Sequence, residues 1–192
     1  MDLRPIAKEP SDAERAVIDA LLGPPGPERT VSVRESAGLR HLLLPALHAL
    51  QDRFGWIPPG ALGYACQRLH VPPAEAWGVA TFYALFAVHE EPPVALHVCD
   101  DVVCRAAGAE ALVAELERSH GPERSARDGR TWHRSPCLGQ CERGPAALLV
   151  AAGLEPRRAT LVAASARDCT QALARGHAGA PPRNRLPQLD AP

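Results

Sequence analysis

The chain has 192 residues and a formal net charge of -1, from 21 basic and 22 acidic side chains. A chain of this length can bury a substantial hydrophobic core without help from disulfides. The balanced charge provides no overall field that would attract nucleic acid or an anionic membrane surface, so we expect neither as a partner.

The first residues and the apolar runs give an expectation about location. Residues 1–5 (MDLRP) lack the basic stretch and apolar core of a signal peptide, and no apolar run approaches the ~20 residues that cross a bilayer. We therefore expect a cytoplasmic protein without direct membrane insertion. In a reducing compartment, six cysteines do not suggest a disulfide framework, so their spacing points to metal or redox chemistry.

Residues 1–38 are predicted to form an N-terminal helix and a linker. Ser11 and Glu14 are spaced as a capping box, in which each side chain satisfies a free amide at a helix start. The helix should end at Gly23-Pro24, because proline fixes φ and carries no amide hydrogen. The polar stretch up to Gly38 has the composition of a linker.

Residues 39–92 are predicted to form a helical bundle. Apolar residues recur at steps of three and four over residues 39–54, and Gly55 should close this helix. The pairs Pro58-Pro59 and Pro72-Pro73 should start two further helices, because the missing proline donor does no harm in a first turn.

Residues 93–177 change to an α/β pattern. Side chains alternate in polarity from Val94 to Cys99, as in a strand, and a helix is predicted from Gly108 to His120. Two more strands are expected at residues 131–135 and 146–150. The overall prediction is an α+β protein, with the N-terminal helical bundle followed by an α/β domain.

The C-terminal end of this domain should be a helix with two recognisable caps. Ser165 and Asp168 have the spacing of an N-terminal cap, and Gly176 lies just past the expected last turn. Residues 178–192, with four prolines and few apolar side chains, are predicted to be a disordered tail.

Four of the six cysteines form two close pairs. Cys99 and Cys104 are arranged as C-x4-C and Cys137 and Cys141 as C-x3-C, with 32 residues between the pairs. Two pairs of thiolates suit a [2Fe-2S] cluster, with two ligands for each iron. The same spacings also suit structural zinc, and the cysteines could instead be unliganded core residues. Spacing alone leaves these three alternatives open.

Five other residues are candidates for ligands or for residues that tune a cluster. Cys66 and Cys169 lie on apolar helical faces and are interpreted as small buried hydrophobic residues, not ligands. His97 shares a strand face with Cys99, and Asp100 and Arg143 lie close to ligand candidates in sequence. Whether these three residues tune a cluster is left open by the sequence.

The cysteine motifs resemble the thioredoxin-like [2Fe-2S] ferredoxin family. This family includes the small cluster-bearing subunit (the E type) of respiratory complex I and its equivalents in NAD-dependent formate dehydrogenases and hydrogenases. The resemblance covers roughly residues 39–176 and is carried by these segments: Val98-Cys99, Cys104, Gly108-Ala109, Cys137-Leu138-Gly139-Gln140-Cys141, Pro145-Ala146, Gly55-Trp56-Ile57-Pro58, Pro72-Pro73-Ala74-Glu75 and Gly78-Val79-Ala80-Thr81-Phe82-Tyr83.

The resemblance implies a thioredoxin-like fold for residues 93–177 and one [2Fe-2S] cluster held by Cys99, Cys104, Cys137 and Cys141. It further implies an electron-transfer subunit, with no catalytic residue of its own, in an NAD(H)-dependent oxidoreductase complex: NADH:quinone oxidoreductase, or a formate dehydrogenase or hydrogenase. The partner would be a larger flavoprotein subunit that binds FMN and NAD(H), and residues 39–92 would pack against it.

The sequence itself agrees that hydride chemistry belongs to another chain. It contains no G-x-G-x-x-G after a strand and no P-loop. Because nicotinamide gives up two electrons as a hydride and an iron–sulfur cluster takes one, a flavin must stand between them. The alternatives are a zinc-stabilised interaction module and a thiol-disulfide enzyme, although the C-x-x-C motif of the latter is missing.

Overall fold

The computed structural model describes residues 8–25 and 38–176. The chain divides into two compact units, one of Met1–Pro93 with Ala152–Pro156 and one of Val94–Ala151 with Arg157–Pro192. The predicted tail at 178–192 and most of the predicted linker lie outside the described residues.

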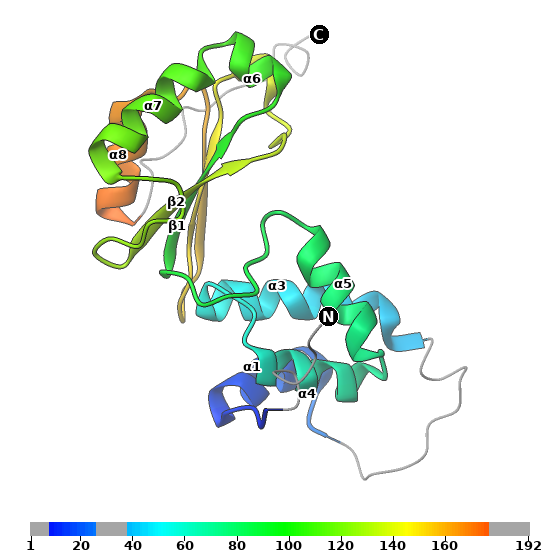
Figure 1. Ribbon diagram of the computed structural model, residues 1–192. Coiled ribbons are helices and arrows are strands. Elements are labelled where there is room, and N and C mark those ends of the chain that lie inside the picture. Colours follow the sequence, from blue (N-terminus) through cyan, green and yellow to red (C-terminus); the bar gives the residue numbers. More distant parts are fainter. Residues whose placement is uncertain (1–7, 26–37, 177–192) are drawn as a thin grey trace, which may run out of the picture. The chain divides into compact units, whose positions relative to one another are not determined.

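The first unit is helical (Figure 1), and its helices begin and end where the local signals predict. Ser11 Oγ accepts a hydrogen bond from the Glu14 amide, and the Glu14 carboxylate accepts one from the Ser11 amide, which confirms the capping box. Gly55 is the left-handed C-cap of its helix, also as predicted. The elements are α1 (Asp12–Leu22), the 3-10 helix η2 (Arg40–Leu42), α3 (Leu43–Phe54), α4 (Pro59–Leu69) and α5 (Pro73–Phe82).

The helices of this unit pack around a core built on Leu47, Leu50 and Leu62, all fully buried. A polar cluster connects α1 to α4 at its margin: the Tyr64 hydroxyl donates to the Asp19 carboxylate over 2.8 Å, and Arg68 pairs with the same carboxylate. Arg68 and Asp19 are partly buried beside the core, and their pairing offsets the cost of removing the two charges from water.

The second unit is a four-stranded mixed sheet with strand order β2-β1-β3-β4. Strand β1 pairs in parallel with β2 and antiparallel with β3, and β3 pairs antiparallel with β4. The strands are β1 (Val94–Cys99), β2 (Arg130–Ser135), β3 (Ala147–Ala151) and β4 (Arg157–Leu161), and the helical elements are α6 (Val102–Ala106), α7 (Ala109–His120), the 3-10 helix η3 (Cys141–Arg143) and α8 (Ala166–Arg175).

The sequence predicts the order strand, helix, strand, strand, helix, and the structure corrects this by adding a fourth strand, β4, before the last helix. It is an edge strand with partly exposed side chains and carries Arg157 and Arg158, so it lacks the alternating polarity that identified the others. The other three strands are confirmed to within one residue at either end. The caps of α8 are also confirmed, with a capping box at Ser165 and a left-handed Gly176.

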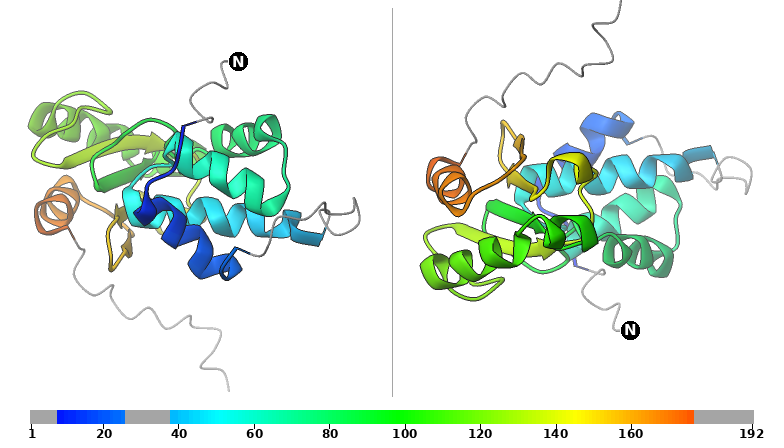
Figure 2. Two further views of the ribbon diagram at one scale, coloured as in Figure 1. Left: turned by 90° about the horizontal axis from the view of Figure 1, so that it is seen from below. Right: turned by 90° about the horizontal axis from the view of Figure 1, so that it is seen from above.

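Helices α7 and α8 pack together and cover one face of this sheet (Figure 1), as two further views also show (Figure 2). Leu96 and Val98 of β1 and Trp132 of β2 point into this layer, where they meet Leu116 of α7 and Leu173 of α8. Because side chains alternate along a strand, His97 and Cys99 belong to the opposite face.

The predicted fold class is confirmed: a helical unit precedes an α/β unit in which a helical crossover joins two parallel strands. Such a crossover brings the carboxyl ends of β1 and β2 to the same edge of the sheet. In the described parts of the chain, no helix has both the length and the apolar character needed to cross a membrane.

We predict that Leu50→Ala destabilises the helical unit by about 2–5 kcal/mol, because Leu50 is fully buried and its removal leaves a cavity. The matched control is Leu44→Ala in the same helix, where the side chain is 37% exposed and the loss should stay below about 1 kcal/mol. Denaturant titration followed by circular dichroism measures both, and equal losses would contradict the described packing of α3.

Candidate metal centre

The parallel pairing of β1 and β2 places the first cysteine beside the start of the second cysteine loop. Cys99 is in register with Ser135, two residues before Cys137. The Asp100 amide donates to the Ser135 carbonyl over 2.8 Å, and the Cys99 amide donates to the Ala146 carbonyl over 2.9 Å. These bonds hold the end of β1 between the two segments that flank the second pair.

The first loop turns directly into a short helix that carries Cys104. Asp101 caps this helix, its carboxylate accepting a hydrogen bond of 2.7 Å from the Val102 amide. Cys104 therefore lies within the short helix α6, which precedes the helix predicted from Gly108 to His120 and was not itself predicted. Cys99 and Cys104 are 1% and 2% exposed, so this pair is shielded from solvent.

The second loop brings its two sulfurs together and leaves them exposed. Cys137 Sγ and Cys141 Sγ lie 3.3 Å apart, and the Gly139 amide donates to Cys137 Sγ over 3.4 Å. Gly139 has φ 72°, which a residue with a Cβ adopts only with strain. The glycine thus permits the tight turn that aims a backbone amide at sulfur.

The pKa directions show that the four thiols are close enough to interact. The pKa of Cys104 is raised, first by burial and then by Cys99, while the backbone of Ala146 opposes the rise; Cys141 adds to it. The pKa of Cys141 is raised first by its hydrogen bond to Cys137, and Cys99 contributes too. Four thiolates here would repel one another, so a positively charged centre is needed to hold them ionised.

The arrangement of the cysteines bears on which kind of metal centre they could hold. Within the described residues, no group of three or more His, Cys, Asp or Glu side chains is arranged to hold one metal ion. The thiols instead form two pairs, as a cluster with two thiolates on each iron requires. Their softness favours iron–sulfur chemistry over hard cations.

Gly144 lies so close to Cys104 that there is little space for a side chain at this position. A Cβ on Gly144 would lie 3.3 Å from Cys104 Sγ and 3.2 Å from the Cβ of Ala107. The segment that contains Gly144 is anchored from both sides, since the amides of Ala163 and Ala164 donate to the carbonyls of Arg143 and Pro145 over 2.8 and 2.9 Å. It has little freedom to move away from a larger residue.

Asp100 is the centre of an ion-pair network beside the first cysteine. Its carboxylate accepts hydrogen bonds from Arg105 Nε over 2.8 Å and from Arg134 Nη1 over 3.1 Å. These bonds, that of Arg105 first, lower the pKa of Asp100. Arg134 also lies 3.5 Å from a Glu117 carboxylate oxygen and connects the loop to α7. The charge of Asp100 is therefore balanced where it adjoins the cysteines.

The other residues considered from the sequence have their own partners or surroundings in the structure. Cys66 lies in the core of the helical unit and Cys169 in the core beneath α8, and burial raises their pKa values to about 11 and about 12. His97 stacks on His133, with ring centroids 5.2 Å apart, and Arg143 donates to Gln140 Oε1 within the second loop. Sequence reasoning missed the positioning roles of Arg134 and Gly144, because neither carries a local signal.

Comparison with known proteins agrees with this geometry. The family model of the thioredoxin-like [2Fe-2S] ferredoxins matches residues 31–160. The E subunit of the NADH-quinone oxidoreductase of Escherichia coli K12 is 37% identical over 108 residues, which are 53% of this chain and 63% of that protein. The corresponding E subunit of Pseudomonas aeruginosa is 35% identical over 112 residues, 55% of this chain and 66% of that protein. The match spans less than two thirds of these relatives.

A solved structure shares the fold. A crystal structure of an NAD+-reducing [NiFe]-hydrogenase aligns with 85% of this chain and 26% of its own chain, with a TM-score of 0.51 and 23% identity. The chain thus combines an α/β unit, two cysteine pairs at one sheet edge and a family match over most of its length. It belongs to the thioredoxin-like [2Fe-2S] ferredoxin family. Membership implies an iron–sulfur cluster.

We predict that Gly144→Ala disturbs the metal centre, because the new methyl group would press on Cys104 Sγ. The expected result is a lower iron content per chain and an altered visible circular dichroism spectrum. Gly78→Ala is the control, since a Cβ there meets nothing within 4 Å. If Gly144→Ala retained the iron content and spectrum of the wild type, the close approach of this segment to the site would be refuted.

Proposed function

We propose that the chain carries one [2Fe-2S] cluster on Cys99, Cys104, Cys137 and Cys141 and transfers single electrons. The observation that carries the proposal is the meeting of two thiol pairs at the carboxyl ends of the parallel strands β1 and β2. In this assignment each pair ligates one iron. When bound, the cluster supplies reversible uptake of one electron.

The protein's own contribution is to bury one pair of ligands and expose the other. Cys99 and Cys104 are shielded, while Cys137 and Cys141 face solvent. Amide donors to sulfur and solvent exposure both affect how easily a cluster is reduced. We infer that the exposed pair marks the side from which electrons enter or leave, because a redox partner can approach it most closely.

The physiological partner in this proposal is a flavoprotein subunit that binds FMN and NAD(H), within a larger NAD-linked oxidoreductase complex. The named relatives, the E subunits of NADH-quinone oxidoreductases, support this assignment. The chemistry supports it as well, since a flavin must convert a hydride into single electrons before a cluster can accept them. The chain is then an enzyme subunit that is inactive on its own.

An exposed aromatic group in the helical unit is the surface we assign to this partner. Phe82, Tyr83 and Leu85 are 79%, 44% and 37% exposed at the end of α5. Phe82 contacts Tyr83 edge to face, with ring centroids 5.2 Å apart, and Tyr83 contacts Phe86 at 5.9 Å. Large aromatic side chains grouped on a surface are typical of protein interfaces.

We predict that the purified chain contains about two irons and two acid-labile sulfides, as one [2Fe-2S] cluster requires. Changing any of Cys99, Cys104, Cys137 or Cys141 to serine should lose or severely destabilise the cluster, because a hydroxyl replaces a soft thiolate. Metal analysis, sulfide assay and the visible spectrum measure this.

Cys66→Ala and Cys169→Ala are the controls for the ligand assignment. Both thiols are buried in separate cores, so these variants should keep the cluster and lose only folding stability. One zinc per chain without sulfide would indicate the structural zinc alternative. Loss of colour in either control, with retention in a serine variant of the four, would overturn the assignment.

We predict that Phe82→Glu weakens association with the flavoprotein subunit at least tenfold, because a charge would enter an apolar interface. The variant should keep its cluster spectrum, since Phe82 is 79% exposed and its loss does not disturb a core. Leu154→Glu is the control, another apolar residue of the same unit that is 85% exposed. Co-purification and reduction of the cluster by NADH plus flavoprotein are the measurements, and unchanged values for Phe82→Glu would refute this docking surface.

A further inference from the structure

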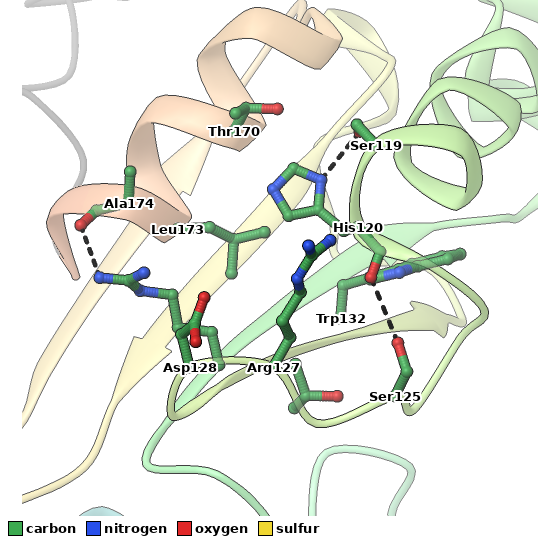
Figure 3. Close-up of a pocket in the computed structure, with 11 residues that line it drawn as sticks. Ser119, His120, Ser125, Arg127, Asp128, Trp132, Thr170, Leu173 and Ala174 are labelled. Atoms are coloured by element: carbon green, nitrogen blue, oxygen red, sulfur yellow. Dashed lines mark hydrogen bonds between the residues drawn. The ribbon is translucent and has the colours of Figure 1, made fainter.

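The α/β unit contains a cavity of about 210 Å³ at the sheet edge opposite the cysteines. Cys99 and Ser135 end β1 and β2, whereas the cavity lies where β2 begins at Arg130. Figure 3 shows it between the last turn of α7, the end of α8 and the turn that precedes β2. The residues that line it are Ser119, His120, Ser125, Arg127, Asp128, Arg130, Thr131, Trp132, Thr170, Leu173 and Ala174.

A tight two-residue turn places two arginines together in this cavity. The amides and carbonyls of Arg127 and Arg130 bond to each other reciprocally, with both distances 2.9 Å. Asp128 and Gly129 between them have φ of 51° and 72°, the left-handed pair that a type I′ turn requires. Residues directly opposite each other in such a ribbon have side chains on the same face.

This pairing places two arginines opposite each other across the turn, so that both side chains leave the same face. Opposed like charges destabilise a strand pair. In the described part of the chain, neither arginine forms an ion pair with a carboxylate, although Asp128 also lines the cavity. Like charges on one face repel, and an anion bound by the guanidinium groups would offset that repulsion.

Two of the carbonyls at the helix ends around the cavity accept hydrogen bonds from other residues and not from the arginines. The Trp132 indole donates to the Gly121 carbonyl over 3.0 Å, and the Ser125 hydroxyl donates to the His120 carbonyl over 3.4 Å. Arg130 Nη2 donates to the Ala174 carbonyl over 2.9 Å, which leaves its other N–H groups available. The guanidinium of Arg127 has no such partner among the described residues.

The imidazole of His120 also lines the cavity, and its pKa is affected by the charge of Arg127. Figure 3 shows the Arg127 side chain extending toward the His120 imidazole, whose Nδ1 lies 2.9 Å from Ser119 Oγ. Burial lowers the pKa of His120, and the charge of Arg127 lowers it further. The charged residues that line the cavity are two arginines and one carboxylate, Asp128, so its lining carries more positive than negative charge.

We propose that this cavity binds a phosphate group, either free or as part of a small phosphate monoester. Two guanidinium groups match the charge and the planar bidentate bonding of a phosphate dianion. Thr170 offers a further hydroxyl on the α8 side, and the volume holds a phosphate with a small substituent. Since the cavity lies at the edge away from the cysteines, this binding is independent of the proposed electron transfer.

The first test is isothermal titration calorimetry of the full cluster-bearing chain with inorganic phosphate and with glycerol 3-phosphate, at constant ionic strength. The expected result is saturable one-to-one binding that Arg127→Gln weakens at least tenfold, equivalent to about 1.4 kcal/mol. Arg124→Gln is the control: this exposed arginine of the same loop pairs with Glu123, does not line the cavity, and should leave the affinity unchanged.

The second test locates the bound anion by indole NMR. The chain has three tryptophans, and of these Trp132 alone lines the cavity, so its indole signal should shift on titration while those of Trp56 and Trp77 stay in place. Tighter binding of the monoester would identify a phosphorylated molecule, and equal binding would identify free phosphate; both support the site. No saturable binding, equal affinity in Arg127→Gln, or shifts confined to Trp56 and Trp77 would overturn the proposal.

Discussion

The parallel pairing of β1 with β2 is the constraint on which the metal centre depends. The two cysteine pairs are 32 residues apart in sequence, and this pairing brings Cys99 level with Ser135 and hence beside the loop of Cys137. A slip by one residue would turn Cys99 to the opposite sheet face and expose Leu96 and Val98. The apolar face beneath α7 and α8 therefore fixes the register that the sulfurs require.

The two cysteine loops differ in what surrounds their sulfurs and so in what would stabilise negatively charged thiolates there. The Cys99–Cys104 pair is buried, and the carboxylate of Asp100 beside it is neutralised by Arg105 and Arg134. The second pair is exposed and relies on a backbone amide at Gly139 and on solvent. In the proposed electron path, this difference in exposure makes the Cys137–Cys141 pair the side open to a redox partner.

The sequence predicts the features of this protein that depend on neighbouring residues, and fails for those that depend on distant ones. The caps at Ser11, Gly55 and Ser165 were predictable because each acts within one helical turn. Strand β4 was missed because an edge strand with two arginines has no buried face to impose alternation. Arg134 and Gly144 were missed because their roles arise from contacts across 34 and 40 residues, with Asp100 and Cys104.

The α/β unit carries the two proposed sites at opposite ends of its parallel strands. Its core, which includes Leu96, Trp132 and Leu116, lies between the cysteine edge and the arginine edge of the sheet. Trp132 and Leu173 are core residues that also line the cavity, and the Trp132 indole donates a hydrogen bond to the Gly121 carbonyl at the end of α7. Arg127 contributes nothing to that core, so its substitution perturbs the cavity while the register of β1 and β2, and with it the metal centre, is preserved.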